Sequence, residues 1–191
     1  MGLEAAITKA WANLLRSGLP NNVSVRFLAD EYVVDVKDRQ VLSLSSNAPA
    51  VDYLTVLILH YLTQRIAGLP ALMGERLGFN GLSAAGSFAE EFKKRSTDLI
   101  VRKYGNNPDD MLLVLDRMPG ERLDQADVAI VLEAFEGVPV FIELYRADEE
   151  FGPEANLLFD KSIMQIFCTE DIVVLAEAVA IAISGEQEGE K

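Results

Sequence analysis

Two groups of side chains in this sequence are suited to acid–base chemistry: the single histidine, His60, and a set of acidic residues much later in the chain. The acids that could work with the histidine are Asp148, Glu149, Glu150 and Asp160. A carboxylate close to an imidazole raises its pKa and orients it, so that the pair can transfer protons. We therefore expect His60 and these acids to line one shared cleft in the folded chain.

His60 lies in an apolar segment, residues 50–67, whose spacing predicts a helix that ends at Gly68. On this helix Tyr53 and Gln64 share the side of His60, roughly opposite an apolar stripe. One interpretation is a second packing face, in which His60 bonds to the backbone or to a carboxylate. The other is a pocket wall, in which His60, Tyr53 and Gln64 bind a ligand. A single histidine excludes zinc sites rich in histidine and iron sites that need two.

The acidic residues also have two interpretations. Several carboxylate oxygens can bind Mg²⁺ or Ca²⁺, but the spacing between Asp148 and Asp160 fits no EF-hand loop, and we assign no metal ligand. The alternative is a solvated turn where the chain leaves a hairpin. In that case Asp160 is the N-cap of a short helix over residues 161–167.

Several glycines lie in the segment after the predicted helix over residues 50–67. Gly81 and Gly86 have the spacing of a phosphate-binding loop. No lysine follows Gly86, and a P-loop needs that ammonium group on the phosphates, so the sequence excludes one. Backbone amides at Ser87 and Phe88 could still hold a small anion where the next helix begins. The alternative is a plain turn between two helices. Neither a G-x-G-x-x-G motif nor a G-x-S-x-G nucleophile elbow occurs.

The charge balance argues against nucleic acid, because 17 basic and 30 acidic residues give a formal net charge of −13 that repels phosphate. The single cysteine, Cys168, excludes an internal disulfide and a cysteine-rich metal site. Its place after Ile166 and Phe167 predicts a buried position. The longest apolar run, Ile172–Ile183, is too short to cross a bilayer, and the N-terminus has no signal-peptide pattern. We expect a cytoplasmic protein that binds neither nucleic acid nor membrane.

Hydrophobic periodicity predicts an α+β fold, with a mostly antiparallel sheet and about five helices in a single pair of layers. Period-two alternation indicates an N-terminal meander over residues 23–44. Two apolar runs joined at Glu136–Gly137 indicate a C-terminal hairpin. Helices are expected over residues 3–16, 50–67, 88–104 and 110–118, and from Thr169 onward. Half of the residues are apolar, which suits one domain over residues 1–184, and residues 185–191 are expected to form a disordered acidic tail.

Several short motifs, taken in order, resemble an uncharacterised prokaryotic family catalogued as domain of unknown function 3786. The motifs are Leu59–Leu62, a glycine-rich stretch leading to Phe88 and Phe92, Asp148–Phe151, Leu158–Asp160 and Thr169–Asp171. The resemblance spans about residues 50–183 and implies a source among anaerobic bacteria and archaea. Some members of the family carry an added cysteine-rich segment of iron–sulfur type, and this chain, with one cysteine, departs from them. The resemblance implies motif positions for His60, Asp148, Glu149, Glu150 and Asp160 but assigns them no role.

Three functions therefore stay open, and the sequence names no cofactor. The first, which we favour, is a non-catalytic binding module. It would hold a small molecule, a cofactor or a partner protein between the His60 helix and the sheet that bears Asp148–Glu150. The second is a hydrolase or transferase that uses His60 and a carboxylate, with or without a divalent cation. The third is a structural or regulatory domain whose aspartates only cap helices and close the hairpin. A homo-oligomer is also consistent with the sequence, because the meander or the hairpin can present an unpaired sheet edge.

Overall fold

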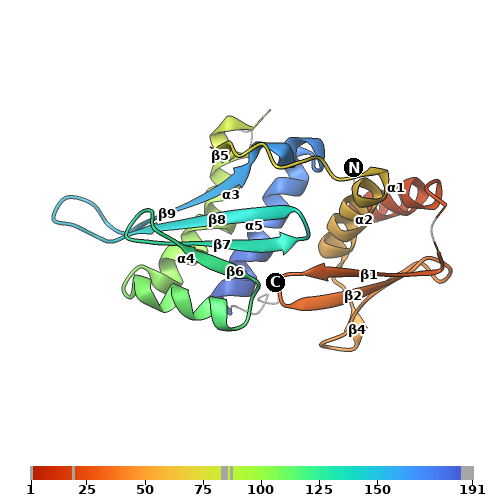
Figure 1. Ribbon diagram of the computed structural model, residues 1–191, viewed down its shortest axis with the longest axis horizontal. Helices are drawn as coiled ribbons and strands as arrows, with labels where there is room; N and C mark the ends of the chain where they lie inside the picture. The colour runs from red at the N-terminus through yellow and green to blue at the C-terminus, as the bar shows by residue number, and fades with distance from the viewer. Residues whose placement is uncertain (1, 19, 83–85, 87, 186–191) are drawn as a thin grey trace.

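The computed structural model describes residues 2–18, 20–82, 86 and 88–185. This part of the chain forms an α+β structure with two antiparallel sheets, one near each end of the longest axis (Figure 1). The fold class predicted from periodicity is therefore confirmed. Ser87 and the predicted tail beyond Gly185 lie outside the described residues.

The helices follow the predicted order. The α-helices are α1 (Leu3–Leu15), α2 (Asp52–Ala67), α3 (Ala89–Arg95), α4 (Thr97–Tyr104) and α5 (Thr169–Ser184). Shorter 3-10 helices are η1 (Phe79–Gly81), η3 (Pro108–Asp116) and η4 (Lys161–Gln165). The predicted helix over residues 88–104 is two helices, because Ser96 leaves helical geometry, with φ −130° and ψ −78°. The predicted helix over residues 110–118 has the tighter 3-10 form and begins at Pro108, whose fixed φ suits a first turn.

The predicted meander forms a sheet of its own, whereas we expected it to share one sheet with the hairpin. Its strands are β1 (Asn22–Phe27), β2 (Asp30–Asp35) and β3 (Gln40–Ser43), and β4 (Ala48–Pro49), which lies outside the predicted range, pairs with β3. Alternation places Val25, Val34 and Val41 on its buried face, as a period of two requires. Next to this sheet α1 and α2 pack against each other.

The predicted hairpin is the centre of the second sheet. Its strands are β7 (Val128–Phe135) and β8 (Val138–Tyr145), and Gly137 at the turn has φ +75°, a conformation that glycine adopts without strain. Three strands that were not predicted complete it in the order β5-β9-β8-β7-β6: β5 (Arg76–Gly78), β6 (Gly120–Leu123) and β9 (Glu154–Asp160). Helices α3, α4 and α5 cover one face (Figure 1), and Ile130, Ile142 and Leu157, which lie side by side in the register, are buried on that face.

The two sheets meet around Phe135 at the end of β7. The Leu28 N–H donates to the Ala134 carbonyl at 2.8 Å, which joins the end of β1 to β7. The Phe135 ring stacks on Tyr61 of α2, with centroids 4.3 Å apart, and also contacts the ring of Phe27. Burial raises the pKa of Tyr61 to about 12, and its hydroxyl donates to the Glu136 carbonyl at 2.9 Å. This aromatic group is the centre of the core between the two sheets.

Cys168 is exposed, so the predicted buried position is wrong. Ile166 and Phe167 are buried as expected, but the chain then turns into α5 and places Cys168 at the N-cap. The thiol accepts the N–H of Asp171, and the Asp171 carboxylate accepts the N–H of Cys168 in return. The helix begins at Thr169, the residue from which it was predicted.

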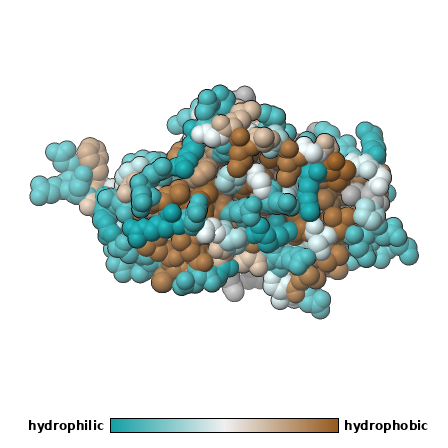
Figure 2. All heavy atoms as spheres, viewed as in Figure 1, coloured by the Kyte–Doolittle hydropathy of each residue, from teal (hydrophilic) through white to brown (hydrophobic). Residues whose placement is uncertain are grey.

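The second face of the larger sheet is turned toward the viewer in Figures 1 and 2. Hydrophilic and hydrophobic residues are mixed across it, and the loop at the far left is largely hydrophilic (Figure 2). The Arg76 guanidinium lies 4.0 Å from the centroid of the Phe141 ring and covers part of the apolar surface. Among the described residues, no helix is both long and apolar enough to span a bilayer.

Candidate functional site

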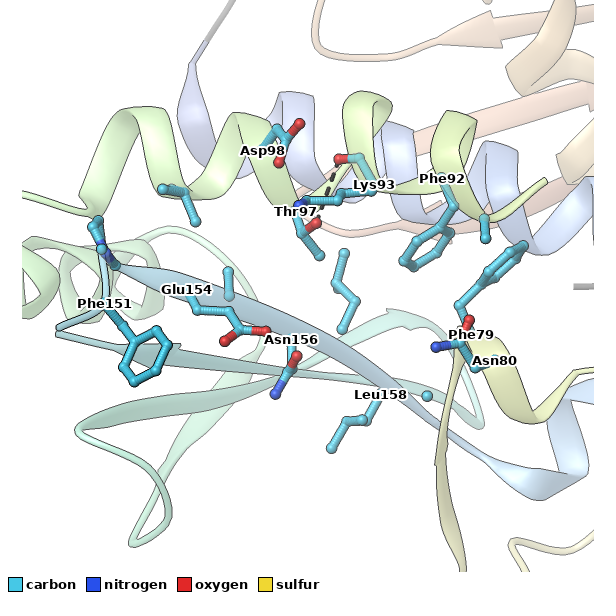
Figure 3. Close-up of a pocket in the computed structure, with 17 residues that line it drawn as sticks. Phe79, Asn80, Phe92, Lys93, Thr97, Asp98, Phe151, Glu154, Asn156 and Leu158 are labelled. Carbon is cyan, nitrogen blue, oxygen red and sulfur yellow. Dashed lines mark hydrogen bonds between the residues drawn. The ribbon is translucent and has the colours of Figure 1, made fainter. Parts of the chain in front are cut away.

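A groove runs between the helices α3 and α4 and the outer edge of strand β9 (Figure 3). Its volume is about 690 Å³, which falls within the roughly 300–1,000 Å³ range of ligand pockets. Figure 3 shows Phe92, Lys93 and Thr97 on the helix side, with Glu154, Asn156 and Leu158 along β9. The groove therefore has a helical wall on one side and a strand edge on the other.

The right end of the groove in Figure 3 forms where β5 stops. After Gly78 the chain leaves the sheet as η1, and Phe79 stacks on Phe92 with ring centroids 4.1 Å apart. Both rings are buried, so they fix the end of the groove. Strand β5 pairs with β9 only from Arg76–Asp160 to Gly78–Leu158, and the rest of β9 is left facing the groove.

The helical wall bends at Ser96. This serine is buried, and its hydroxyl (2.6 Å) and its N–H (3.0 Å) both donate to the Phe92 carbonyl where α3 stops. The chain restarts at Thr97 as α4, so residues from both helices, including Lys93 and Val101, line the groove.

The left end of the groove in Figure 3 is formed by the loop between β8 and β9, residues 146–153, which we call the acidic loop. The Asp148 carboxylate accepts the N–H groups of Glu150 (2.8 Å) and Phe151 (2.7 Å), and these bonds hold the tip as a tight turn. Pro153 packs against Gly105 at the end of α4. A Cβ on Gly105 would lie 2.9 Å from the proline ring and 2.5 Å from the Val101 carbonyl, so the approach requires glycine.

The free part of β9 presents backbone hydrogen-bonding groups to the groove. In a strand, successive residues direct their N–H and C=O groups to opposite sides. Lys161, just past the strand, donates its N–H toward β5, to the Glu75 carbonyl at 2.8 Å. Counting back in steps of two, Leu157 and Ala155 face that same side, while Asn156 faces β8 and lies opposite Glu143. Among the described residues no strand pairs with β9 at Glu154–Leu157 on the groove side.

The groove is mixed in polarity. Its apolar surface comes from Phe79, Phe92, Val101, Phe151, Pro153 and Leu158. The charged groups at its wall and rim are Lys93, Asp98 and Glu154. In the described part of the chain Lys93 has no ion-pair partner within 4.0 Å. Such a lining suits a ligand with both apolar and hydrogen-bonding groups.

His60 does not line this groove. Its Nδ1 lies 2.9 and 3.0 Å from the two carboxylate oxygens of Asp171, in the first turn of α5. The pair therefore ties α2 to the N-terminus of α5, which is the contact that the packing interpretation of His60 expects. The sequence analysis named Asp171 only as part of the motif Thr169–Asp171 and did not pair it with His60.

The other residues predicted near His60 are spread out. Tyr53 lines a separate cavity of about 230 Å³ beside Tyr32 and Met118, and Gln64 lies half-buried one turn after His60 on α2. Ser87 lies outside the described residues. The predicted ligand face of α2 therefore does not form part of the groove.

The predicted acids separate into two places. Asp148, Glu149 and Glu150 are exposed in the acidic loop, which projects from the end of the larger sheet far from α2 (Figure 1). Asp160 lies at the opposite end of β9. The structure therefore does not bring His60 together with the acidic loop. The described residues also contain no group of three or more His, Cys, Asp or Glu side chains that could hold a metal ion.

Asp160 is buried, with 5% of its surface exposed, and acts as a backbone cap. Its carboxylate accepts the N–H groups of Met73 (3.0 Å), Gly74 (2.8 Å) and Ser162 (2.9 Å), so the predicted N-cap role is present and extends to the β5 approach. Burial alone would raise the pKa of Asp160, but the hydrogen bonds from Ser162, Met73 and Gly74 outweigh it and hold the pKa below its usual value.

We expect Asp160→Asn to lower the free energy of unfolding at pH 7 by about 2 kcal/mol, because a charged acceptor becomes neutral. The folded pKa is lowered, so the wild-type carboxylate stabilises the fold fully above the unfolded pKa of about 3.9. That stability is lost as the pH falls through the folded value. Urea unfolding between neutral and acidic pH should therefore show a steeper acid loss for the wild type than for the variant. The exposed Glu149→Gln serves as control, and parallel pH curves for wild type and Asp160→Asn would contradict this.

Sequence reasoning missed the groove because its lining comes from short segments with no chemical motif. Gly105 permits the close approach of Pro153 that shapes one end of the groove, but isolated glycines and prolines first indicate turns. A usable signal was the alternation of Ala155, Leu157 and Phe159 with Asn156 and Leu158, which is typical of a strand with one buried face.

Comparison with protein families gives one match: the model of a family described as a domain of unknown function (DUF3786) covers residues 9–182. This confirms the resemblance that the sequence motifs indicated. No curated protein and no solved structure shows significant similarity to the chain.

Proposed function

Since this chain belongs to DUF3786, a family described only as a domain of unknown function, we propose from its geometry that it is a non-catalytic binding module. Its site is the groove between α3, α4 and β9, rather than a cleft between His60 and the acidic loop. The observation that carries this proposal is the combination in one place of an apolar wall and a strand edge that no described strand pairs with. The wall supplies apolar contact area, and the strand edge supplies directed backbone hydrogen bonds.

The apolar wall supports binding because it has exposed apolar surface, and burial of that surface by a ligand is favourable. Phe92 and Leu157 are largely buried already, and Val101 and Leu158 are half-buried, so a ligand in the groove would complete their burial. Burial of apolar area contributes roughly 25 cal/mol per Å². The polar groups Lys93, Asn80 and Asn156 then favour ligands that can form hydrogen bonds at set positions.

A fragment library screened by ¹H–¹⁵N NMR tests the proposal. Binding fragments should shift the amide signals of groove residues such as Thr97 and Asn156, and Val101→Trp should weaken their binding at least about tenfold by filling the groove. The matched control is Leu113→Trp, at a position on η3 with 63% exposure outside the groove, which should leave the shifts unchanged. Fragments that gather elsewhere, or that bind Val101→Trp as well as wild type, would overturn the groove as the site.

A further inference from the structure

We infer that the groove receives an extended segment of a partner protein, which adds to the edge of β9 as a further strand and carries basic residues toward the acidic loop. This inference rests on the proposed function of the groove and names the class of its ligand. Strand addition to an open sheet edge is a common mode of peptide recognition, in which main-chain hydrogen bonds give affinity and side-chain pockets give specificity.

The groove follows the line that β5 leaves at Gly78. Up to that residue β5 pairs antiparallel with β9, and beyond it the chain turns away into η1. A segment that continues this line lies about 4.8 Å from β9 and meets the outward N–H and C=O groups of Leu157 and Ala155. The free stretch, Glu154–Leu157, has room for about four paired residues of the segment, roughly 13 Å at the rise of a strand.

The alternation of β9 sets the pattern of the segment. Ala155 and Leu157 are buried beneath the helices, and the alternating residues Glu154, Asn156 and Leu158, labelled in Figure 3, belong to the other face of the strand. A paired strand has the same alternation, so every second residue of the segment meets the wall made by α3 and α4. These residues should be apolar, and the residues between them polar.

The negative charge at the open end of the groove favours a bound segment with positive charge. Glu154 lines this end of the groove, Asp148, Glu149 and Glu150 are exposed in the acidic loop that leads to it, and the whole chain has a formal net charge of −13. Arg146 at the base of the loop is paired with Asp109 at 2.6 Å, so it does not neutralise the tip. Complementary charge speeds association and fixes the register of a bound partner, and the effect weakens with added salt. A lysine or arginine at the segment end beside the acidic loop fits this field.

A second copy of this chain is a poorer occupant than a basic partner. Each copy would bring another net charge of −13 to the interface, and like charges oppose association. Each copy would also bring its own α3–α4 wall to an edge where, among the described residues, the unpaired stretch is just Glu154–Leu157. These features favour a separate, extended and basic segment.

The test uses a phage-displayed library of random decapeptides, selected on the wild-type protein after depletion on Val101→Trp. We expect enriched peptides with alternating apolar residues and at least one lysine or arginine. The best of them is then synthesised in two forms, with backbone N-methyl groups on alternate residues of either parity. One of the two methylated peptides lacks the N–H groups that face β9. It should bind at least about tenfold more weakly, as expected for lost hydrogen bonds. The other methylated peptide keeps those N–H groups, and its affinity should change little.

A chain variant gives the reciprocal test. Ala155→Pro removes an N–H that faces the groove and should weaken the unmodified peptide, while Leu113→Trp should not. Peptides that bind the groove but tolerate both methylation patterns would overturn strand addition and leave the binding function standing. Failure to enrich any peptide while fragments still bind would have the same meaning. A wild-type dimer that Ala155→Pro or Val101→Trp dissociates would replace the partner by a second copy, and an empty groove in every assay would remove both proposals.

Discussion

Phe135→Ala should lower the free energy of unfolding by about 3–5 kcal/mol, a large share of the roughly 5–15 kcal/mol that holds an ordinary domain folded. Phe135 has no exposed surface. The centroid of its ring lies 4.3 Å from that of Tyr61, 4.9 Å from that of Phe27 and 6.2 Å from that of Phe167. These rings come from three separate segments, so the cavity left by alanine cannot close by moving one neighbour. Urea unfolding followed by circular dichroism measures the loss.

The matched control is Phe151→Ala, the same change at a side chain that is 70% exposed. We expect it to alter stability by only about 0.5 kcal/mol, as surface substitutions usually do. Equal losses in the two variants would contradict the central place given to Phe135. We also propose that the two sheets unfold together as one domain. Fluorescence of Trp11, which reports on α1, should then follow the same transition as circular dichroism.

Asn156→Pro should lower the free energy of unfolding by about 3 kcal/mol, and Ala155→Pro by clearly less. The two residues are neighbours in β9, but their N–H groups face opposite sides. Asn156 faces β8, so proline there leaves the Glu143 carbonyl without its partner. Ala155 faces the groove, where proline removes a donor that no described strand uses, and edge strands tolerate proline on that side. Chemical denaturation of the two variants measures the difference.

Asn156→Ala is the control for the side chain, since it keeps the N–H that proline removes. It should alter stability by about 0.5 kcal/mol. If Ala155→Pro were the more damaging proline variant, the assignment of alternate backbone groups in β9 would be reversed. The strand-addition inference would then fail with it.

The parts of the fold that the sequence predicted are those set by local pattern. The meander over residues 23–44 and the hairpin at Glu136–Gly137 each bury one face, and period-two alternation reports that directly. Strands β5, β6 and β9 were missed because they are short or lie next to turn signals. Strands β6 and β9 pair with the edges that β7 and β8 present, and β5 pairs in turn with β9. The break at Ser96 was missed for a similar reason, since the two helices beside it have one continuous helical pattern in the sequence.

The candidate site was harder to predict because chemistry-bearing residue types attracted attention first. His60 and Asp160 have functional side chains, but their partners are Asp171 and the backbone near Gly74, and no local pattern brings these groups together. The groove instead depends on the edge at Ala155, beside which no strand lies in the described part of the chain, and on the approach of Pro153 to Gly105. Both are properties of tertiary packing. The acidic loop was recognised from sequence, but its place at the end of a groove was not.

The short free edge of β9 also has a consequence for solubility. Bare strand edges are templates on which sheet proteins associate into insoluble aggregates, and natural sheets limit them with short lengths, nearby charge or covering elements. Here the stretch that no described strand covers spans Glu154–Leu157, α3 and α4 line the same groove, and the acidic loop joins the Glu154 end. The same features that leave space for one extended segment therefore keep this edge from growing into a fibril.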